Sequence, residues 1–167
     1  MAVIATVSSP EKATLAEAAG SDHVIDYRRQ DVVAEVRKIA PDGVDVIVEV
    51  AAAANADIDA AVLGRNGVVS IYAGSGDDTV TVNIRPMMMI NARWQFLLLY
   101  TLPVEVKTAA VETIQAAVAA GAIRVGDEAG LPLYRFDLQQ TASAHAAVAA
   151  GAVGKVLITI DDDPAVD

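Results

Sequence analysis

Residues 44–50, Val-Asp-Val-Ile-Val-Glu-Val, form a mostly apolar, β-branched run that constrains the fold more than any other stretch. Pro41-Asp42-Gly43 precedes the run, and small residues follow it. A strand that is apolar on both faces is typical of a parallel sheet covered on both sides. In such sheets ligands bind beyond the carboxyl ends of the strands. We therefore expect a buried central strand over 44–50 and a ligand site near residues 49–55.

Strand-like and helix-like segments alternate on both sides of this run. The other expected strands are 2–7, 23–27, 68–72, 93–100 and 155–160. The expected helices are 10–19, 32–40, 55–63, 104–120 and 138–150, with Asn55 capping the third and Val111, Ile114 and Val118 as the buried stripe of the fourth. This alternation predicts the α/β class, a doubly wound (Rossmann-type) and mainly parallel sheet.

Composition excludes several classes of function. The formal net charge of −10 disfavours binding to nucleic acid, because an acidic surface repels phosphates. The chain has no cysteine, so it has no disulfide, no Cys-ligated zinc and no thiol catalysis. No targeting or membrane-spanning segment is evident, and we expect a cytoplasmic protein that does not bind membranes. Length predicts one domain over residues 1–160, followed by an acidic, disordered tail over 161–167.

Several segments together resemble a known family. Residues 6–12 and 19–27 resemble the second strand, helix and third strand of a medium-chain dehydrogenase/reductase cofactor domain, and 43–49 resembles its fourth strand. Residues 63–74 resemble its glycine turn and following strand, and 144–156 its terminal helix and strand. The subgroup to which the chain is most similar is the zinc-independent quinone oxidoreductases of the zeta-crystallin type.

The resemblance implies that parts of the family's chain precede this one. The family's catalytic domain, its first strand and the glycine-rich turn that holds the pyrophosphate have no counterpart here, so we expect an incomplete Rossmann-type sheet. The absent strand would be the central one, and unpaired strand edges are costly. We therefore expect either that residues 2–7 shift to pair with 44–50 or that another chain fills the slot.

The function that the resemblance implies is the cofactor-binding part of an NADPH-dependent oxidoreductase that reduces a quinone, an enone or another carbonyl compound. The chain by itself is expected to be inactive, and a substrate is expected only with the missing catalytic domain. Three alternatives stay open. They are a fragment of a zinc-type alcohol dehydrogenase, a non-catalytic oligomerising or remnant module, and a nucleotide-binding regulatory domain.

The first group of candidate cofactor residues lies after the expected strands 2–7 and 23–27. Positions 7–9 hold no Asp or Glu, which favours NADPH over NADH, because a carboxylate here binds the NAD ribose whereas hydroxyls and cations suit the 2′-phosphate. By resemblance Lys12 and Tyr27 contact that phosphate, beside Ser8 and Ser9. The alternative for these residues is a helix cap and surface charge.

The second group follows later strands, and by resemblance it lines the track of the cofactor. Its members are Val50, Ala51, Asn55, Tyr72, Ala73, Gly74, Leu98, Leu99 and Lys155. No catalytic or metal-binding residue is predicted: His23 and His145 have no suitable partners, and Asp57 and Asp59 face different sides of a helix. The family also implies a homodimer through the edge strand 93–100, whose apolar residues would be an aggregation hazard if exposed.

Overall fold

The computed structural model describes residues 1–160, so the tail predicted for 161–167 lies outside the described residues. The chain divides into two compact units, residues 1–28 with 116 onward, and residues 29–115. Every strand pair is parallel, as predicted for an α/β protein. Among residues 1–160, no helix combines the length and apolar character needed to cross a membrane.

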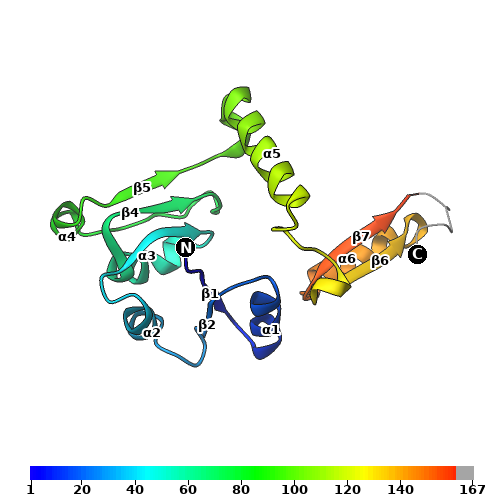
Figure 1. Ribbon diagram of the computed structural model, residues 1–167, viewed down its shortest axis with the longest axis horizontal. Coiled ribbons are helices and arrows are strands. Elements are labelled where there is room, and N and C mark those ends of the chain that lie inside the picture. Colours follow the sequence, from blue (N-terminus) through cyan, green and yellow to red (C-terminus); the bar gives the residue numbers. More distant parts are fainter. Residues whose placement is uncertain (161–167) are drawn as a thin grey trace. The chain divides into compact units, whose positions relative to one another are not determined.

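The first unit begins with a βαβ motif (Figure 1): β1 (Ile4–Val7), α1 (Pro10–Ala18) and β2 (His23–Asp26). As predicted, Ser9 caps α1, its side chain accepting a hydrogen bond from the backbone N–H of Lys12. The unit continues with η2 (Asp127–Ala129), β6 (Leu133–Asp137), η3 (Leu138–Gln140), α6 (Thr141–Ala149) and β7 (Lys155–Thr159). Strands β6 and β7 pair in parallel.

The second unit is a three-stranded sheet in the order β3-β4-β5. Its elements are α2 (Val32–Ile39), β3 (Val44–Glu49), α3 (Ala52–Val62), β4 (Leu63–Ile71), α4 (Ile84–Met89), β5 (Arg93–Phe96) and η1 (Leu99–Thr101). The division between the units falls within α5 (Val104–Ala119), after Gln115. The core lies between the sheet and α3, and its buried members are Ala52, Leu63, Val69 and Ile71.

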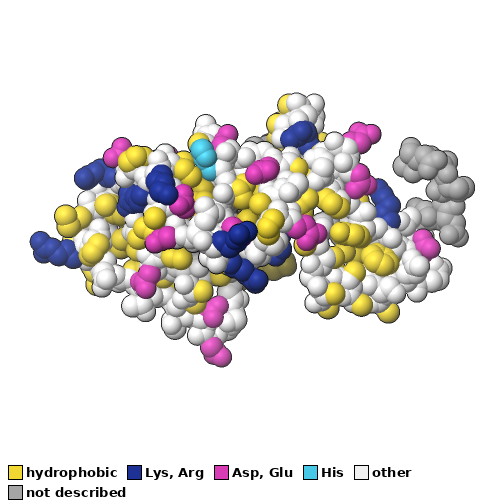
Figure 2. Space-filling view, turned by 90° about the horizontal axis from the view of Figure 1, so that it is seen from below, with side chains coloured by type: hydrophobic (Ala, Val, Ile, Leu, Met, Phe, Trp, Pro, Cys, Tyr) yellow, Lys and Arg dark blue, Asp and Glu magenta, His cyan; other side chains and the backbone are white. Residues whose placement is uncertain are grey.

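The prediction that 44–50 is buried on both faces was wrong. Strand β3 lies at one edge of its sheet, and Val46 and Val48 are 60% and 69% exposed. Because side chains alternate along a strand, Ile47 and Glu49 point to the opposite face, where α3 packs. Figure 2 shows many apolar side chains open on one face of the molecule. A β-branched run therefore identified the strand but not its burial.

Four further features differ from prediction. The predicted buried stripe on α5 is absent. Val111, Ile114 and Val118 are each more than half exposed, and no residue of α5 is buried. The strand predicted for 93–100 ends at Phe96, and the 3-10 turn Leu99–Thr101 follows two residues later. Helix α3 begins at Ala52 rather than at Asn55, so Asn55 does not cap it. Helix α4 was not predicted at all.

The prediction of a turn at residues 66–67 before the strand was wrong, because β4 (Leu63–Ile71) runs through these residues. Strand β4 begins at Leu63, earlier than expected, and pairs with Val44 before a register shift brings Val68 beside Val46. Asn66 in this interruption has a left-handed φ of 62°. Strand β1 pairs with β2, and β3 with β4; both alternatives expected for residues 2–7 and 44–50 stay predictions.

Candidate functional site

The carboxyl ends of β1 and β2 bring the first group of predicted residues together. Val7 lies opposite Asp26 in the parallel ladder, and the backbone N–H of Tyr27 donates to the carbonyl of Val7 at 3.0 Å. Ser8 and Tyr27 therefore follow adjacent strand ends. Tyr27 is 51% exposed, so its phenol is accessible to a ligand.

Helix α1 starts at this edge and brings two further polar groups. Ser9 Oγ accepts from the Lys12 N–H at 3.3 Å, so the hydroxyl caps the helix and still has its own proton to donate. The Lys12 side chain is exposed. Hydroxyl donors, an ammonium group and a helix N-terminus are the groups that bind a phosphate in proteins. Both interpretations of Ser9, as a cap and as a ligand residue, are compatible with this geometry.

The carboxyl ends of β3, β4 and β5 bring together most of the second group. The N–H of Tyr72 donates to the Glu49 carbonyl at 3.3 Å, and the N–H of Leu97 to the Ile71 carbonyl at 2.8 Å. Tyr72, Leu98 and Leu99 are each more than half exposed. These side chains form an open, largely apolar surface.

A loop of small residues follows β4. Ala73 and Gly74 are exposed, and a Cβ built on Gly74 would approach only the Asp78 carboxylate, at 3.6 Å. Asp78 accepts a hydrogen bond from the N–H of Ser75 at 2.8 Å, and that bond lowers the pKa of Asp78. The loop thus closes on itself and leaves space beside Gly74.

Glu49, the last residue of β3, organises the start of α3. Its carboxylate accepts hydrogen bonds from the N–H of Val50 at 2.7 Å and the N–H of Ala51 at 2.5 Å. It also accepts from Asn55 Nδ2 at 3.1 Å. Glu49 is only 6% exposed. The predicted site residues Val50, Ala51 and Asn55 are therefore all held by one buried carboxylate that was not itself among the predicted site residues.

Asp59 is a second buried acid beside Glu49. It is 3% exposed, and its Oδ2 atom has no hydrogen-bond partner among the described residues. Burial, the charge of Glu49 and a hydrogen bond with Glu49 raise the pKa of Asp59 to about 7. The prediction that Asp57 and Asp59 are no pair is compatible with these positions, since Asp57 is exposed. Asp59 of α3 is instead paired with Glu49 at the end of β3.

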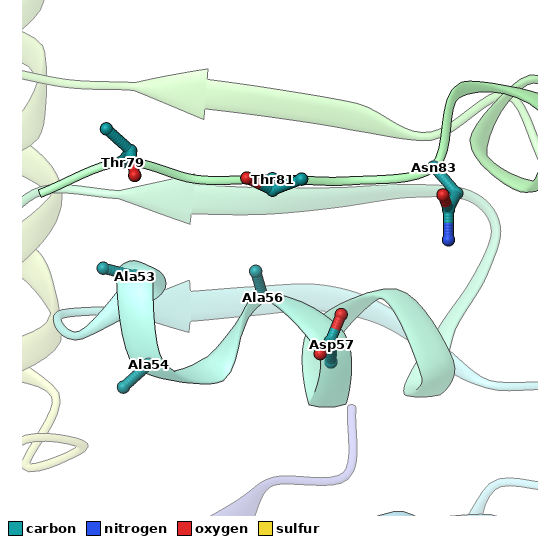
Figure 3. A pocket seen from close by; sticks show the side chains of 7 residues that line it. All are labelled: Ala53, Ala54, Ala56, Asp57, Thr79, Thr81 and Asn83. Atoms are coloured by element: carbon teal, nitrogen blue, oxygen red, sulfur yellow. The ribbon is translucent and has the colours of Figure 1, made fainter.

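A shallow groove lies between α3 and the extended segment 79–83 (Figure 3). Its volume is about 370 Å³, and it is lined by Ala53, Ala54, Ala56, Asp57, Thr79, Thr81 and Asn83. The Asp57 carboxylate and the Asn83 amide point into it in Figure 3. The lining has hydroxyl, amide and carboxylate groups but no nucleophile with an adjacent base. Nothing in the sequence pattern predicted this groove.

The remaining predicted residue is Lys155, which opens β7. Its N–H donates to the carbonyl of Pro132 at 2.9 Å, and its side chain is exposed. His23 and His145 are exposed as well, and no group of three or more His, Cys, Asp or Glu suited to a metal ion occurs in residues 1–160.

The predicted cofactor residues thus fall into one group per unit. Ser8, Ser9, Lys12, Tyr27 and Lys155 belong to the first unit, and the others belong to the second. Within each unit, most of the predicted residues follow the carboxyl ends of neighbouring parallel strands. This is the edge at which α/β folds bind ligands.

The sequence and fold match known proteins. A family model described as zinc-binding dehydrogenase matches residues 1–116. The fold is similar to that of a Pseudomonas syringae pv. Tomato DC3000 quinone oxidoreductase, at 21% identity and a TM-score of 0.74, over 95% of this chain and 49% of that one. It is also similar to Escherichia coli quinone oxidoreductase complexed with NADPH, at 22% identity and a TM-score of 0.72, over 95% and 49% of the two chains.

A third solved structure extends the likeness to alcohol dehydrogenases. An alcohol dehydrogenase zinc-binding domain protein from Burkholderia ambifaria matches at 18% identity and a TM-score of 0.81, over 96% of this chain and 42% of that one. No curated protein matches the chain significantly. The chain spans about half or less of the length of these three structures, and at such identities their likeness concerns the fold.

Proposed function

This chain belongs to the zinc-binding dehydrogenase family of medium-chain dehydrogenase/reductases, and we propose that it forms the NADPH-binding part of a quinone, enone or carbonyl reductase. The observation that carries the proposal is the set of polar groups at the ends of β1 and β2. Ser8, Ser9 and Lys12 offer donors and a positive charge, and no carboxylate occupies positions 7–9. These groups fit a 2′-phosphate better than a free ribose hydroxyl.

The bound cofactor would supply the hydride, and the protein would bind and orient it. Lys12 would balance the phosphate charge, while Ser8 and Tyr27 would donate hydrogen bonds to it. In the second unit, Glu49 would keep the turn at Val50 and Ala51 fixed. The exposed apolar side chains of Tyr72 and Leu98 would cover the uncharged rings of the cofactor and exclude water from them.

The test is a thermal-shift titration with NADPH and NADH at equal concentrations. A ligand that binds only the native state raises the free energy of unfolding by about 2.7 kcal/mol at a hundred times its dissociation constant. We expect a larger shift with NADPH than with NADH, and we expect Lys12→Ala to abolish that difference. Lys38→Ala is the matched control, because Lys38 forms a surface ion pair with Glu35 in the other unit. The absence of a shift with either cofactor would contradict the proposal.

Two alternatives make different predictions, one about the reaction catalysed and one about the thermal shift. A zinc-type alcohol dehydrogenase is favoured by the family description and by the Burkholderia ambifaria structure. It would couple cofactor binding to alcohol oxidation rather than to quinone reduction once a catalytic domain is supplied. A non-catalytic remnant module would show no cofactor-dependent stabilisation. On our proposal, the chain alone binds NADPH without turning over substrate.

We also propose that the chain forms a homodimer through the edge of β5. Strand β5 lies at the edge of its sheet, and Phe96 and Tyr100 near its end are 68% and 87% exposed. Pairing of two such edges would cover apolar side chains and satisfy unpaired backbone groups. Analytical ultracentrifugation tests this: Phe96→Glu should convert a dimer to a monomer, and a monomeric wild-type chain would refute the proposal.

A further inference from the structure

Glu49 and Asp59 form a buried pair of carboxyl groups between β3 and α3. Both side chains are more than nine-tenths buried, and the two are hydrogen-bonded to each other. Glu49 accepts from the N–H groups of Val50 and Ala51 and from the Asn55 amide. A carboxylate that accepts three N–H donors is best suited to the ionised form.

Asp59 must supply the proton in its bond to Glu49. Two ionised carboxylates in contact repel each other, and burial disfavours the charged form further. The Asp59 side chain has no other hydrogen bond among the described residues, and its Oδ2 atom is buried and unpaired. The pair is therefore an ionised Glu49 with a protonated Asp59 as its fourth donor.

The other charged groups on neighbouring elements bind backbone carbonyls, pair with each other or are exposed to water. Arg37 of α2 donates to the carbonyls of Pro41 and Ala61, Arg65 of β4 to that of Met89, and Arg93 of β5 to that of Asn66. Glu35 and Lys38 of α2 pair with each other, while Asp45 of β3 and Asp57 of α3 are exposed. Glu49 is therefore the charged group that raises the pKa of Asp59.

We propose that Asp59 is a positioning residue, which by sharing its proton with Glu49 fixes the turn from β3 into α3. When Asp59 ionises, Glu49 loses its fourth donor and the two negative charges repel each other, so the Glu49 carboxylate is held less firmly against the amides of Val50 and Ala51. The turn then loses the acceptor that holds its backbone. The structural part of this inference is independent of ligand, whereas its effect on NADPH rests on the function proposed above.

The direction of the effect follows from the titration of Asp59. The pKa of Asp59 is raised from 3.8 to about 7, so the acid holds its proton at pH 6 and has lost it at a pH well above 7. The turn is therefore ordered on the acidic side of this value. Cofactor affinity should weaken as the pH rises through it.

Amide NMR of the whole chain tests the structural part. The N–H resonances of Val50 and Ala51 should titrate with a common midpoint near pH 7. Asp59→Asn should abolish that midpoint, because an amide donates to Glu49 at every pH. The control Asp57→Asn, an exposed aspartate on the same helix, should leave it unchanged. Resonances that do not titrate, or that titrate unchanged in Asp59→Asn, would overturn the inference.

A second variant covers the case in which Asp59→Asn does not fold. Glu49→Gln removes the charge that opposes ionisation of Asp59, so the midpoint should move to lower pH. An unchanged midpoint would show that Asp59 does not titrate against Glu49.

NADPH binding, measured by calorimetry on either side of the midpoint, separates this inference from the proposed function. We expect the wild-type dissociation constant to increase several-fold on the alkaline side, and that of Asp59→Asn to change less. Equal pH dependence in both proteins would refute the role of Asp59 in binding. If NADPH does not bind at any pH, the proposed function fails, and the NMR titration still decides whether Asp59 fixes the turn.

Discussion

Gly43 is the position where one added methyl group should damage the second unit most. It lies in the turn before β3 with a left-handed φ of 92°. A Cβ at this position would lie 2.6 Å from both the Cα and the N of Gly64 in β4. Because both clashing atoms belong to backbone, no side-chain rotation relieves the contact. Gly43→Ala therefore combines a conformational cost with a steric one.

The two costs can be estimated separately. An alanine in the left-handed region lowers the free energy of unfolding by about 1–2 kcal/mol. The reduced flexibility of the unfolded chain offsets about 0.4–1 kcal/mol of this loss. Moving the start of β4 away from the new methyl group adds about 1–3 kcal/mol, as overpacking does elsewhere. We expect Gly43→Ala to lower the free energy of unfolding by about 2–4 kcal/mol.

Two other glycines provide matched controls. Gly20 also has a positive φ, 101°, but a Cβ there meets nothing within 4 Å, so Gly20→Ala should cost only about 1 kcal/mol or less. Gly76→Ala in the second unit meets no atom and has no positive φ, so it should be nearly neutral. Urea denaturation followed by circular dichroism, and by fluorescence of Trp94 in the second unit, measures all three. Equal losses in Gly43→Ala and Gly20→Ala would refute the steric argument.

Three further predictions concern stability. Between pH 3.8 and about 7, Asp59 is protonated in the folded state and ionised in the unfolded state. Its contribution to the free energy of unfolding therefore falls as the pH rises through this window. In urea titrations, the free energy of unfolding of Asp59→Asn should rise relative to that of the wild type by up to about 4 kcal/mol between acid and neutral pH. A difference between the two proteins that does not change with pH would contradict this linkage to the titration of Asp59. Ser9→Ala removes the cap of α1 and should lower the free energy of unfolding by about 1 kcal/mol, measured by circular dichroism; no loss would show that the cap does not stabilise the helix. Val69→Ala at a fully buried site should cost about 2 kcal/mol by Trp94 fluorescence, whereas Val46→Ala on the exposed face of β3 should cost much less.

The sequence by itself determined the features that depend on neighbouring residues. Ser9 caps α1 because its side-chain oxygen reaches an N–H three residues ahead in the same chain segment. The β-branched run at 44–50 gave a strand, and the alternation of such segments gave a parallel α/β fold of the predicted family. Most of the strand ends followed from the same local pattern, whereas the candidate cofactor residues beyond them came from the family resemblance.

Only the tertiary structure decided which side chains are buried and what they meet. The spacing of Glu49 and Asp59 contains no hint of a pair, although Asp59 interrupts the buried stripe of Ala52, Ala56 and Val62 on α3. The exposure of Val46 and Val48, and of Ile114 on α5, likewise contradicted patterns that are apolar in the sequence. A pattern states which face of an element can be buried, but burial requires a second element to pack against that face. Packing between segments distant in the chain therefore determined the buried acid pair, the exposed face of β3 and the groove beside α3.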